Sequence, residues 1–259
     1  MELKLCLIMI ITPQYIFLPK MLKCLNDLCY HKYMNIIYKP CGMAREYSPY
    51  ALNIYIGCSH RCKYCYAPHT LQRKKSEYFG RPEPRKDILK LLEKDLQKNK
   101  YTEQVLLSFV GDCYCDSTDN GETVREVLKM LNYYKVPVAV LSKGGKKMLR
   151  DLDIFKQFGD RITVGTTLTF LDENKSKEWG PFAGTPSERL ETLKTLHDNG
   201  IKTFASFEPT IEPEESLKLI KKTLALTKNY VYYIFLLYNI YNFIFIAKKY
   251  LYKLQHSKF

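Results

Sequence analysis

Short strand patterns alternate with amphipathic helix patterns along residues 50–228. The strand patterns are rich in β-branched or aromatic residues and lie at 52–56, 104–110, 136–141, 162–169 and 201–207. Apolar residues recur at helical spacing between and after these strands, at 88–96, 124–131, 147–158, 186–199 and 213–227. This alternation predicts an α/β fold of parallel strands joined by right-handed crossovers. With a sixth strand at 230–236 we expect a partial (β/α)6 TIM-like barrel; a flat doubly wound sheet is the alternative.

The helix pattern at 186–199 has the clearest boundaries in the sequence. Thr185 can cap its first turn, Pro186 suits the first helical position, and Glu188 can complete a capping box. Gly200 can end the helix, because glycine adopts the left-handed conformation that often follows a last turn. These signals predict a helix whose two ends are both set by local residues.

Polar or cysteine residues follow each predicted strand. The carboxyl ends of parallel strands meet at one edge of the sheet, where α/β proteins place their functional sites. We therefore expect a site at this edge, assembled from residues that are distant in sequence. Its candidates are the cysteine loop 58–65 and Asp112, Cys113, Ser142, Lys143, Thr167, Thr169 and Glu208.

The two ends of the chain depart from the repeating pattern. We expect residues 1–40 to form an irregular, poorly ordered extension and residues 41–228 to form the core domain. The atypical tail, 229–259, contains an uncharged run of 18 residues at 230–247. About 20 apolar residues span a bilayer, but two asparagines and five tyrosines in this run weaken a membrane interpretation. We favour a last strand and helix over a membrane-associated or unfolded tail, and we expect no membrane partner.

The net charge of +13 is unevenly distributed. After Glu215 the sequence has eight lysines and no acidic residue, whereas residues 58–217 carry 26 basic and 24 acidic residues. The local exception is a basic segment, 61–86, with only two acidic residues. Its eight basic residues are Arg61, Lys63, Arg73, Lys74, Lys75, Arg81, Arg85 and Lys86. Such a segment can attract phosphates; a solvated basic loop is the alternative.

Three of the nine cysteines, Cys58, Cys62 and Cys65, share one loop with the spacing C-x3-C-x2-C. No convincing export signal precedes them, so we expect a reduced, cytoplasmic protein, in which clustered cysteines indicate metal or redox chemistry. A structural zinc site takes four ligands, so His60 or His69 would have to complete it. Three thiolates suit an iron–sulfur cluster that leaves one iron open to a small molecule.

The cysteine spacing, with the aromatic Tyr64 before the last cysteine and a strand pattern before the first, resembles the radical S-adenosylmethionine superfamily. The wider run "REYSPYALNIYIGCSHRCKYCYAP" is similar to the branch related to spore photoproduct lyase. The later segments "VLLSFVGD", "VAVLSKGG" and "LDENKSKEWGPFAGTPSERLETLKTLHDNGIKTFASFEPTIEPEES" agree with that branch. The resemblance covers roughly residues 40–225.

The resemblance implies a [4Fe–4S] cluster on Cys58, Cys62 and Cys65, with S-adenosylmethionine chelating the fourth iron. An electron from the reduced cluster would cleave the sulfonium and give a 5′-deoxyadenosyl radical that abstracts hydrogen from a substrate. The implied electron donor is a low-potential protein of the flavodoxin or ferredoxin type. The sequence identifies neither the substrate nor an oligomeric state, and repair of a DNA lesion by a lyase-type reaction is one version of the activity.

Five further residues are candidates for binding S-adenosylmethionine. By the resemblance, Tyr64 would lie near the adenine, Lys143 would pair with the carboxylate, and Thr167 would hydrogen-bond to the cofactor. Asp112 and Glu208 would contact ribose hydroxyls or substrate. Each also has a plain structural alternative: a loop aromatic, a solvated lysine, an ordinary strand threonine, or carboxylates that shape their loops.

Cys113 and Cys115, in "GDCYCDSTD", are catalytic candidates. Spore photoproduct lyase uses a further cysteine after its second strand to return hydrogen to a product radical, and Cys113 can be placed on that position. Aligning on Asp112 instead puts Phe109 there. A second metal site and inert thiols are the alternatives.

Two other functions compete with the radical enzyme. One is a zinc-binding, nucleic-acid-binding module without catalysis, which would use the basic segment to hold its ligand. The other is a truncated relative that keeps the cysteine motif but cannot turn over.

Overall fold

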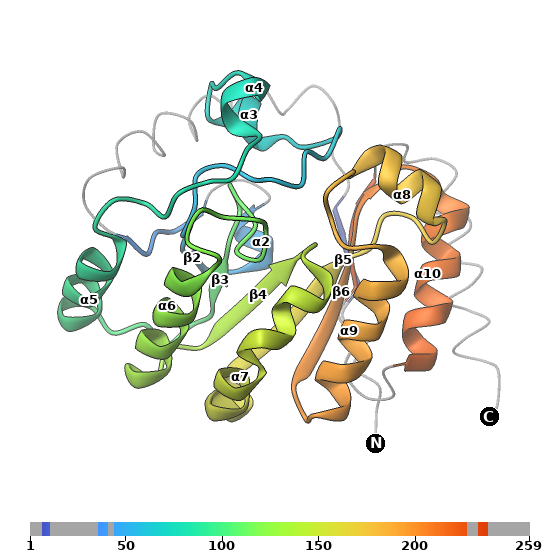
Figure 1. Cartoon of the computed structure of the whole chain (residues 1–259). Coiled ribbons are helices and arrows are strands. Elements are labelled where there is room, and N and C mark those ends of the chain that lie inside the picture. The colour runs from blue at the N-terminus through green and yellow to red at the C-terminus, as the bar shows by residue number, and fades with distance from the viewer. Residues whose placement is uncertain (1–6, 11–35, 41–43, 227–232, 238–259) are drawn as a thin grey trace.

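The computed structural model describes residues 7–10, 36–40, 44–226 and 233–237 (Figure 1). Its centre is a seven-stranded sheet in which every neighbouring pair of strands is parallel, in the order β1-β7-β6-β5-β4-β3-β2. The strands are β1 Leu7–Ile10, β2 Tyr50–Ala51, β3 Val105–Leu107, β4 Val138–Ser142, β5 Ile162–Thr167, β6 Lys202–Thr210 and β7 Tyr233–Leu237. The sheet is curved, and the predicted partial barrel of parallel strands is confirmed.

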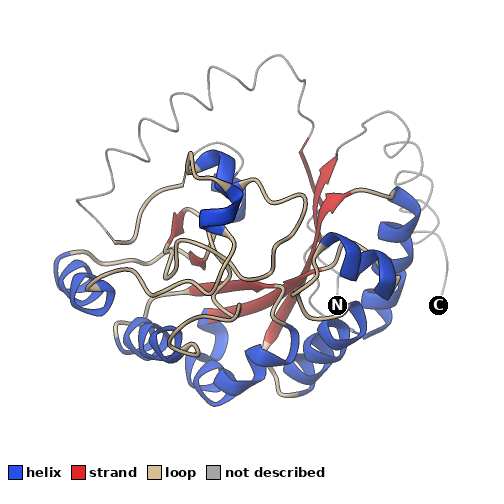
Figure 2. Ribbon diagram, turned by 45° about the horizontal axis from the view of Figure 1, so that its top comes forward, coloured by secondary structure: helices blue, strands red, loops and turns tan. Residues whose placement is uncertain are grey.

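Helices cover the outer face of the curved sheet, as Figure 2 shows. The long ones are α5 Ile88–Lys98, α6 Glu122–Tyr133, α9 Pro186–Asp198 and α10 Pro213–Leu226. Shorter ones are α2 Ala44–Tyr47, α3 Ala67–Thr70, α4 Lys75–Tyr78, α7 Leu152–Phe158, α8 Glu173–Trp179 and the 3₁₀ helices η2 Gly145–Asp151 and η3 Gly159–Arg161. The short helices α3 and α4 lie beyond one end of the strands, away from the row of long helices (Figure 1).

The helices are held to the sheet by the apolar stripes that the sequence predicts. Helix α5 buries Ile88, Leu92 and Leu96, and α6 buries four apolar residues against the same core. Each fully buried side chain of this size contributes about 1.5–3 kcal/mol relative to an exposed one. Segment 36–37 also reaches this core, where Ile37 N donates to Asp95 Oδ2 at 2.9 Å.

The predicted start of α9 is confirmed in part. Thr185 Oγ1 accepts a hydrogen bond from Glu188 N at 3.2 Å, and Pro186 opens the helix. The Glu188 carboxylate accepts a hydrogen bond from Lys146 N of η2 at 2.9 Å, and this bond takes the place of the reciprocal bond of a capping box. Gly200 follows the helix with a φ of +80°, which agrees with the predicted end.

Strands β2 and β3 both end earlier than predicted, because the Asn53 side chain accepts hydrogen bonds that a neighbouring strand would otherwise accept. The predicted strand 52–56 is wrong: β2 comprises only Tyr50–Ala51. The chain then bends, and the Asn53 Oδ1 atom accepts from Phe109 N at 2.9 Å and Val110 N at 3.1 Å. These two N–H groups belong to the predicted strand 104–110, which therefore ends at Leu107.

The ends of the chain add two strands to one side of the sheet. Strand β7 confirms the predicted sixth strand, and β1 pairs with it in parallel register, which the sequence did not indicate. Most of the predicted extension 1–40 and tail 229–259 lies outside the described residues. Within the described ranges, no helix is long and apolar enough to cross a membrane.

Candidate metal and cofactor site

The cysteine loop follows β2 and is fixed by backbone hydrogen bonds to two distant helices. Cys58 N donates to Tyr78 O of α4 at 3.2 Å, and Lys63 N donates to Trp179 O of α8 at 2.8 Å. Gly57 has a φ of +144°, and a Cβ there would lie 3.1 Å from Tyr78 O. The close approach of the loop to α4 therefore requires glycine at this position.

The three thiols of the loop are all free. Cys58 and Cys62 are buried and Cys65 is partly buried. Within the described part of the chain, no three His, Cys, Asp or Glu side chains are close enough to hold one metal ion. A tetrahedral zinc ion needs four ligands around a single atom, whereas each thiolate of an iron–sulfur cluster binds a different iron. Three thiolates are one short of the four ligands of a structural zinc ion, and they fit an iron–sulfur cluster that leaves one iron open.

Two cations lie next to these thiols. The Nζ atom of Lys143, at the end of β4, is 5.7 Å from the centroid of the Tyr64 ring. Burial alone would lower the pKa of Lys143, but neighbouring Tyr64, Cys62 and Asp112 outweigh it and raise that pKa. Burial raises the pKa of the Cys65 thiol, and Lys143 opposes this shift. The predicted neighbours Tyr64 and Lys143 are thus brought together beside the cysteines.

Arg189 is the second cation, and the sequence analysis did not identify it. It projects from α9 and is almost fully buried. Its guanidinium donates to Gly184 O at 2.7 Å, Thr167 O at 2.6 Å and Ser176 Oγ at 3.1 Å. Burial lowers its pKa, and the nearby Tyr64 and Cys62 oppose that shift. No local pattern distinguishes this arginine from a solvated one, because all its partners lie in other elements.

Asp112 connects the ends of two strands. Its carboxylate accepts from Ser142 Oγ at 2.6 Å, Lys143 N at 2.7 Å and Tyr114 N at 2.9 Å. Burial alone would raise the pKa of Asp112, but His60 and these donors hold it well below its usual range. The predicted contact of Asp112 with ribose or substrate stays a prediction; its observed contacts position Lys143.

His60 links the cysteine loop to this carboxylate and was considered in the sequence only as a zinc ligand. Its Nε2 atom lies 3.1 Å from Asp112 Oδ2, and its Nδ1 atom lies 3.1 Å from Phe182 O. The ring is buried. It therefore ties the middle of the cysteine loop to the end of β3 and to the segment after α8.

The remaining predicted cofactor residues lie at the ends of β5 and β6. The Tyr64 hydroxyl is 3.4 Å from Thr169 Oγ1, which donates to Glu208 O at 3.4 Å. Thr167 is buried, and its carbonyl accepts from Arg189. This places Tyr64 against the strand ends that carry Thr167 and Glu208.

The two catalytic candidates Cys113 and Cys115 have different surroundings. Cys113 is buried in the main core, with its Sγ atom 4.0 Å from Leu107 O. Cys115 belongs to a small buried cluster with Cys58, and the two thiols are near enough for each to shift the pKa of the other. Contact with Cys115 and burial raise the pKa of Cys58. Of the two candidates, Cys115 is therefore the one that touches the cysteine motif.

Comparisons with known proteins agree on one family and one fold. A model of the Radical SAM superfamily matches residues 52–227. An uncharacterised protein of Methanocaldococcus jannaschii is 34% identical over 163 residues, which are 62% of this chain and 60% of that protein. A 5-amino-6-(D-ribitylamino)uracil–L-tyrosine 4-hydroxyphenyl transferase of Methanococcus vannielii is 27% identical over 194 residues, 67% of this chain and 52% of the enzyme. The chain thus spans only part of the length of these curated relatives.

Two kinds of solved structure share the fold. A spore photoproduct lyase mutant with bound AdoMet and dinucleoside spore photoproduct has a TM-score of 0.59 and 13% identity, covering 82% of this chain and 62% of that one. SuiB of Streptococcus suis, bound to S-adenosylmethionine, has a TM-score of 0.55 and 14% identity, covering 91% of this chain and 52% of that one. At such identities the likeness is one of fold.

Proposed function

The chain belongs to the radical SAM superfamily, and from this premise we propose that it is an enzyme that reductively cleaves S-adenosylmethionine. Cys58, Cys62 and Cys65 would hold a [4Fe–4S] cluster. When bound, such a cluster would supply the one electron needed to cleave S-adenosylmethionine into methionine and a 5′-deoxyadenosyl radical, the species that would abstract hydrogen from a substrate.

The observation that carries this proposal is the geometry of the cysteine loop. It presents three free thiols at the carboxyl edge of a parallel sheet, beside the two cations Lys143 and Arg189. The nearby positive charge of Lys143 opposes the effect of burial on the pKa of Cys65, and such charge attracts a carboxylate. Three thiolates would bind three of the four irons of the cluster, and the fourth iron would be open to an external ligand.

The surrounding residues would bind and orient the cofactor. Lys143 would pair with the methionyl carboxylate, and the Tyr64 ring would pack against the adenine. Thr167 and Glu208 would supply polar contacts from the strand ends. Asp112, whose carboxylate already accepts three protein hydrogen bonds, would act by holding the Lys143 backbone in place.

The substrate and the reductant are also proposals. The basic segment 61–86 supports a nucleic-acid substrate, and lesion repair of the lyase type is the specific version. Cys115, beside Cys58, would then be the better placed of the two hydrogen-donor candidates. A low-potential protein of the flavodoxin or ferredoxin type would supply the electron.

Anaerobic reconstitution tests the proposal. We expect a brown protein with about four irons, and we expect dithionite with S-adenosylmethionine to yield 5′-deoxyadenosine, detected by mass spectrometry. Alanine at Cys58, Cys62 or Cys65 should abolish both, while Cys113→Ala is the matched control for iron content, because Cys113 lies in the main core.

Two other outcomes would replace this function. A colourless protein with one zinc per chain would favour the nucleic-acid-binding module. A cluster that binds S-adenosylmethionine without yielding 5′-deoxyadenosine would identify a relative that does not turn over.

A further inference from the structure

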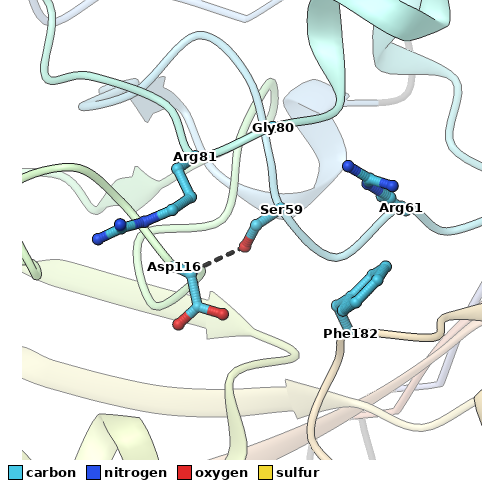
Figure 3. A pocket seen from close by; sticks show the side chains of 6 residues that line it. All are labelled: Ser59, Arg61, Gly80, Arg81, Asp116 and Phe182. Atoms are coloured by element: carbon cyan, nitrogen blue, oxygen red, sulfur yellow. Dashed lines mark hydrogen bonds between the residues drawn. The ribbon is translucent and has the colours of Figure 1, made fainter.

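A cavity of about 370 Å³ lies against the cysteine loop. Its lining residues are Ser59, Arg61, Gly80, Arg81, Asp116 and Phe182. Figure 3 shows Arg61 and Phe182 on one side, Arg81 on the other, and Ser59 and Asp116 between them. Small-molecule sites have volumes of about 300–1,000 Å³, so the cavity can hold a small ligand or one unit of a polymer. Ser59 and Arg61 lie in the cysteine loop, but none of the lining residues is a predicted metal ligand or cofactor-binding residue.

The cavity carries an excess of positive charge. The negative charge of Asp116 is neutralised by an ion pair with Lys147. The Asp116 backbone N–H donates a hydrogen bond to Ser59 Oγ at 2.7 Å. Arg81 Nη2 donates to two neutral acceptors, Ser117 O at 2.9 Å and Asn120 Oδ1 at 3.3 Å. Among the described residues, neither Arg61 nor Arg81 forms an ion pair with a carboxylate.

Phe182 gives the cavity an aromatic wall. Its side chain is 53% exposed. The Arg61 guanidinium lies 5.2 Å from the centroid of its ring, within reach of a cation–π interaction. The Phe182 backbone is held by His60, whose carbonyl accepts from Phe182 N at 3.4 Å and whose Nδ1 atom lies 3.1 Å from Phe182 O. The ring is thus exposed on a fixed backbone.

We propose that this cavity binds one nucleotide unit, with the base stacked on Phe182 beside Arg61 and the phosphate held by Arg81. Guanidinium groups bind phosphate oxygens by charge-assisted hydrogen bonds. Aromatic side chains in a positively charged groove stack with bases of any sequence. The unit is either a free nucleoside monophosphate or a nucleotide within a single strand, because both present the same two groups.

The basic segment that contains both arginines extends the positive field beyond the cavity. Arg73, Lys74 and Lys75 are exposed on and before α4, and none of them forms an ion pair within the described residues. Lys63 is the member of the segment that is neutralised, by Glu178 at 2.9 Å. A strand that places one nucleotide in the cavity would therefore find further phosphate contacts nearby, which favours the strand as the source.

The inference does not require the cluster, so it can be tested separately from the proposed activity. The probes are adenosine monophosphate and a fluorescent single-stranded oligonucleotide of mixed sequence, with affinity measured by calorimetry and by polarisation over a range of salt. We expect Phe182→Ala to weaken binding by roughly 5- to 150-fold without changing the salt dependence, since stacking carries no charge. Phe182→Trp should restore the affinity.

The arginine variants, unlike Phe182→Ala, remove a positive charge from the cavity. Arg61→Ala and Arg81→Ala should each weaken binding of the oligonucleotide, and Arg81→Ala should reduce the slope of log K against log salt by about 0.7. The matched controls are Lys129→Ala on α6 and Lys194→Ala on α9, two exposed lysines in helical ion pairs; they should bind as the wild type does.

The outcomes separate the two sources and can overturn the proposal. Binding of the oligonucleotide without adenosine monophosphate identifies a strand as the ligand, and the converse identifies a free nucleotide. Failure to bind either probe overturns the inference and leaves the test for 5′-deoxyadenosine untouched. Equal losses in the cavity variants and the control lysines would also overturn it, since they would show a diffuse basic surface.

Discussion

At the scale of single residues, the Asp119 carboxylate lies outside the candidate site and accepts hydrogen bonds from four donors. It accepts from Tyr55 Oη at 2.8 Å, Ser117 Oγ at 2.7 Å, Thr123 N at 2.9 Å and Gly121 N at 3.2 Å. Burial alone would raise its pKa, but the donors outweigh burial and hold the pKa well below its usual range. The residue thus joins the start of α6 to the buried Tyr55.

We expect Asp119→Asn to lower the free energy of unfolding by about 2 kcal/mol at pH 7, because an amide nitrogen cannot accept these hydrogen bonds. A carboxylate with a depressed folded-state pKa contributes stability above its unfolded pKa of about 3.9, and this contribution is lost as pH falls through the folded pKa. The gap between wild type and variant should therefore be constant above about pH 5 and narrow below about pH 4.

Urea unfolding at pH 7, 5, 4 and 3 measures this gap. Asp160→Asn is the control, since Asp160 is exposed and bound mainly by Lys202. A gap that stays constant down to pH 3 would contradict the role given to the Asp119 charge.

Lys143 forms two hydrogen bonds through its backbone, and both can remain when its side chain is replaced. Lys143 N donates to Asp112, and Lys143 O accepts from Gly184 N at 2.9 Å. On the proposed function, Lys143→Ala should weaken binding of S-adenosylmethionine by about 10- to 100-fold, the loss of one charge-assisted hydrogen bond. Lys143→Arg should recover part of the affinity.

Equilibrium binding to the reconstituted protein checks this, with iron content measured in the same samples. Unchanged affinity at full iron content would remove Lys143 from the cofactor site.

At the scale of elements, Arg189 holds α9 to the site. Its three acceptors are in β5, in α8 and in the segment before α9. Arg189→Ala should destabilise the fold by about 3 kcal/mol, because it leaves buried acceptors without donors. Arg189→Lys should cost less but not be neutral, since an ammonium group cannot reproduce the planar fork.

Chemical unfolding compares these variants with Lys194→Ala, a change on the exposed face of the same helix that should stay within about 0.5 kcal/mol of wild type. If Arg189→Ala matched Lys194→Ala, the three hydrogen bonds would have no net effect on stability.

The helices were predictable because their apolar stripes are local. The stripes of α5 and α6 repeat within one element, and Thr185 caps α9 from the adjacent position. The lengths of β2 and β3 were not predictable, because Asn53 takes the place of a strand partner for residues 56 positions away. Propensity for strand is strong in both segments, and a tertiary contact overrides it.

The candidate site also has residues that the local sequence predicts and residues whose roles depend on tertiary contacts. The spacing of Cys58, Cys62 and Cys65 is a local signal, and the position of Lys143 directly after its strand follows from the rule on carboxyl ends. His60 and Arg189 take their roles from contacts with residues up to 122 positions away. A single sequence carries no signal for such pairings, and neither residue type indicates burial by itself.

At the scale of the whole molecule, the cysteine loop is a junction between parts of the barrel. It is bound to α4 through Cys58, to α8 through Lys63, and through His60 to the end of β3. Ordering this loop should therefore stabilise more than the loop itself. Any group that binds the folded state and not the unfolded one raises the free energy of unfolding by mass action.

We accordingly expect the protein with a reconstituted cluster to unfold at a Tm about 5–10 °C above that of the iron-free protein, which corresponds to roughly 3 kcal/mol in a chain of this size. Cys62→Ala should remove this increment, whereas Cys113→Ala should lower both Tm values equally and preserve the difference. Anaerobic calorimetry with iron analysis measures both. Equal Tm values at full iron content would contradict this prediction, because they would mean that the unfolded chain holds the cluster as tightly as the folded one.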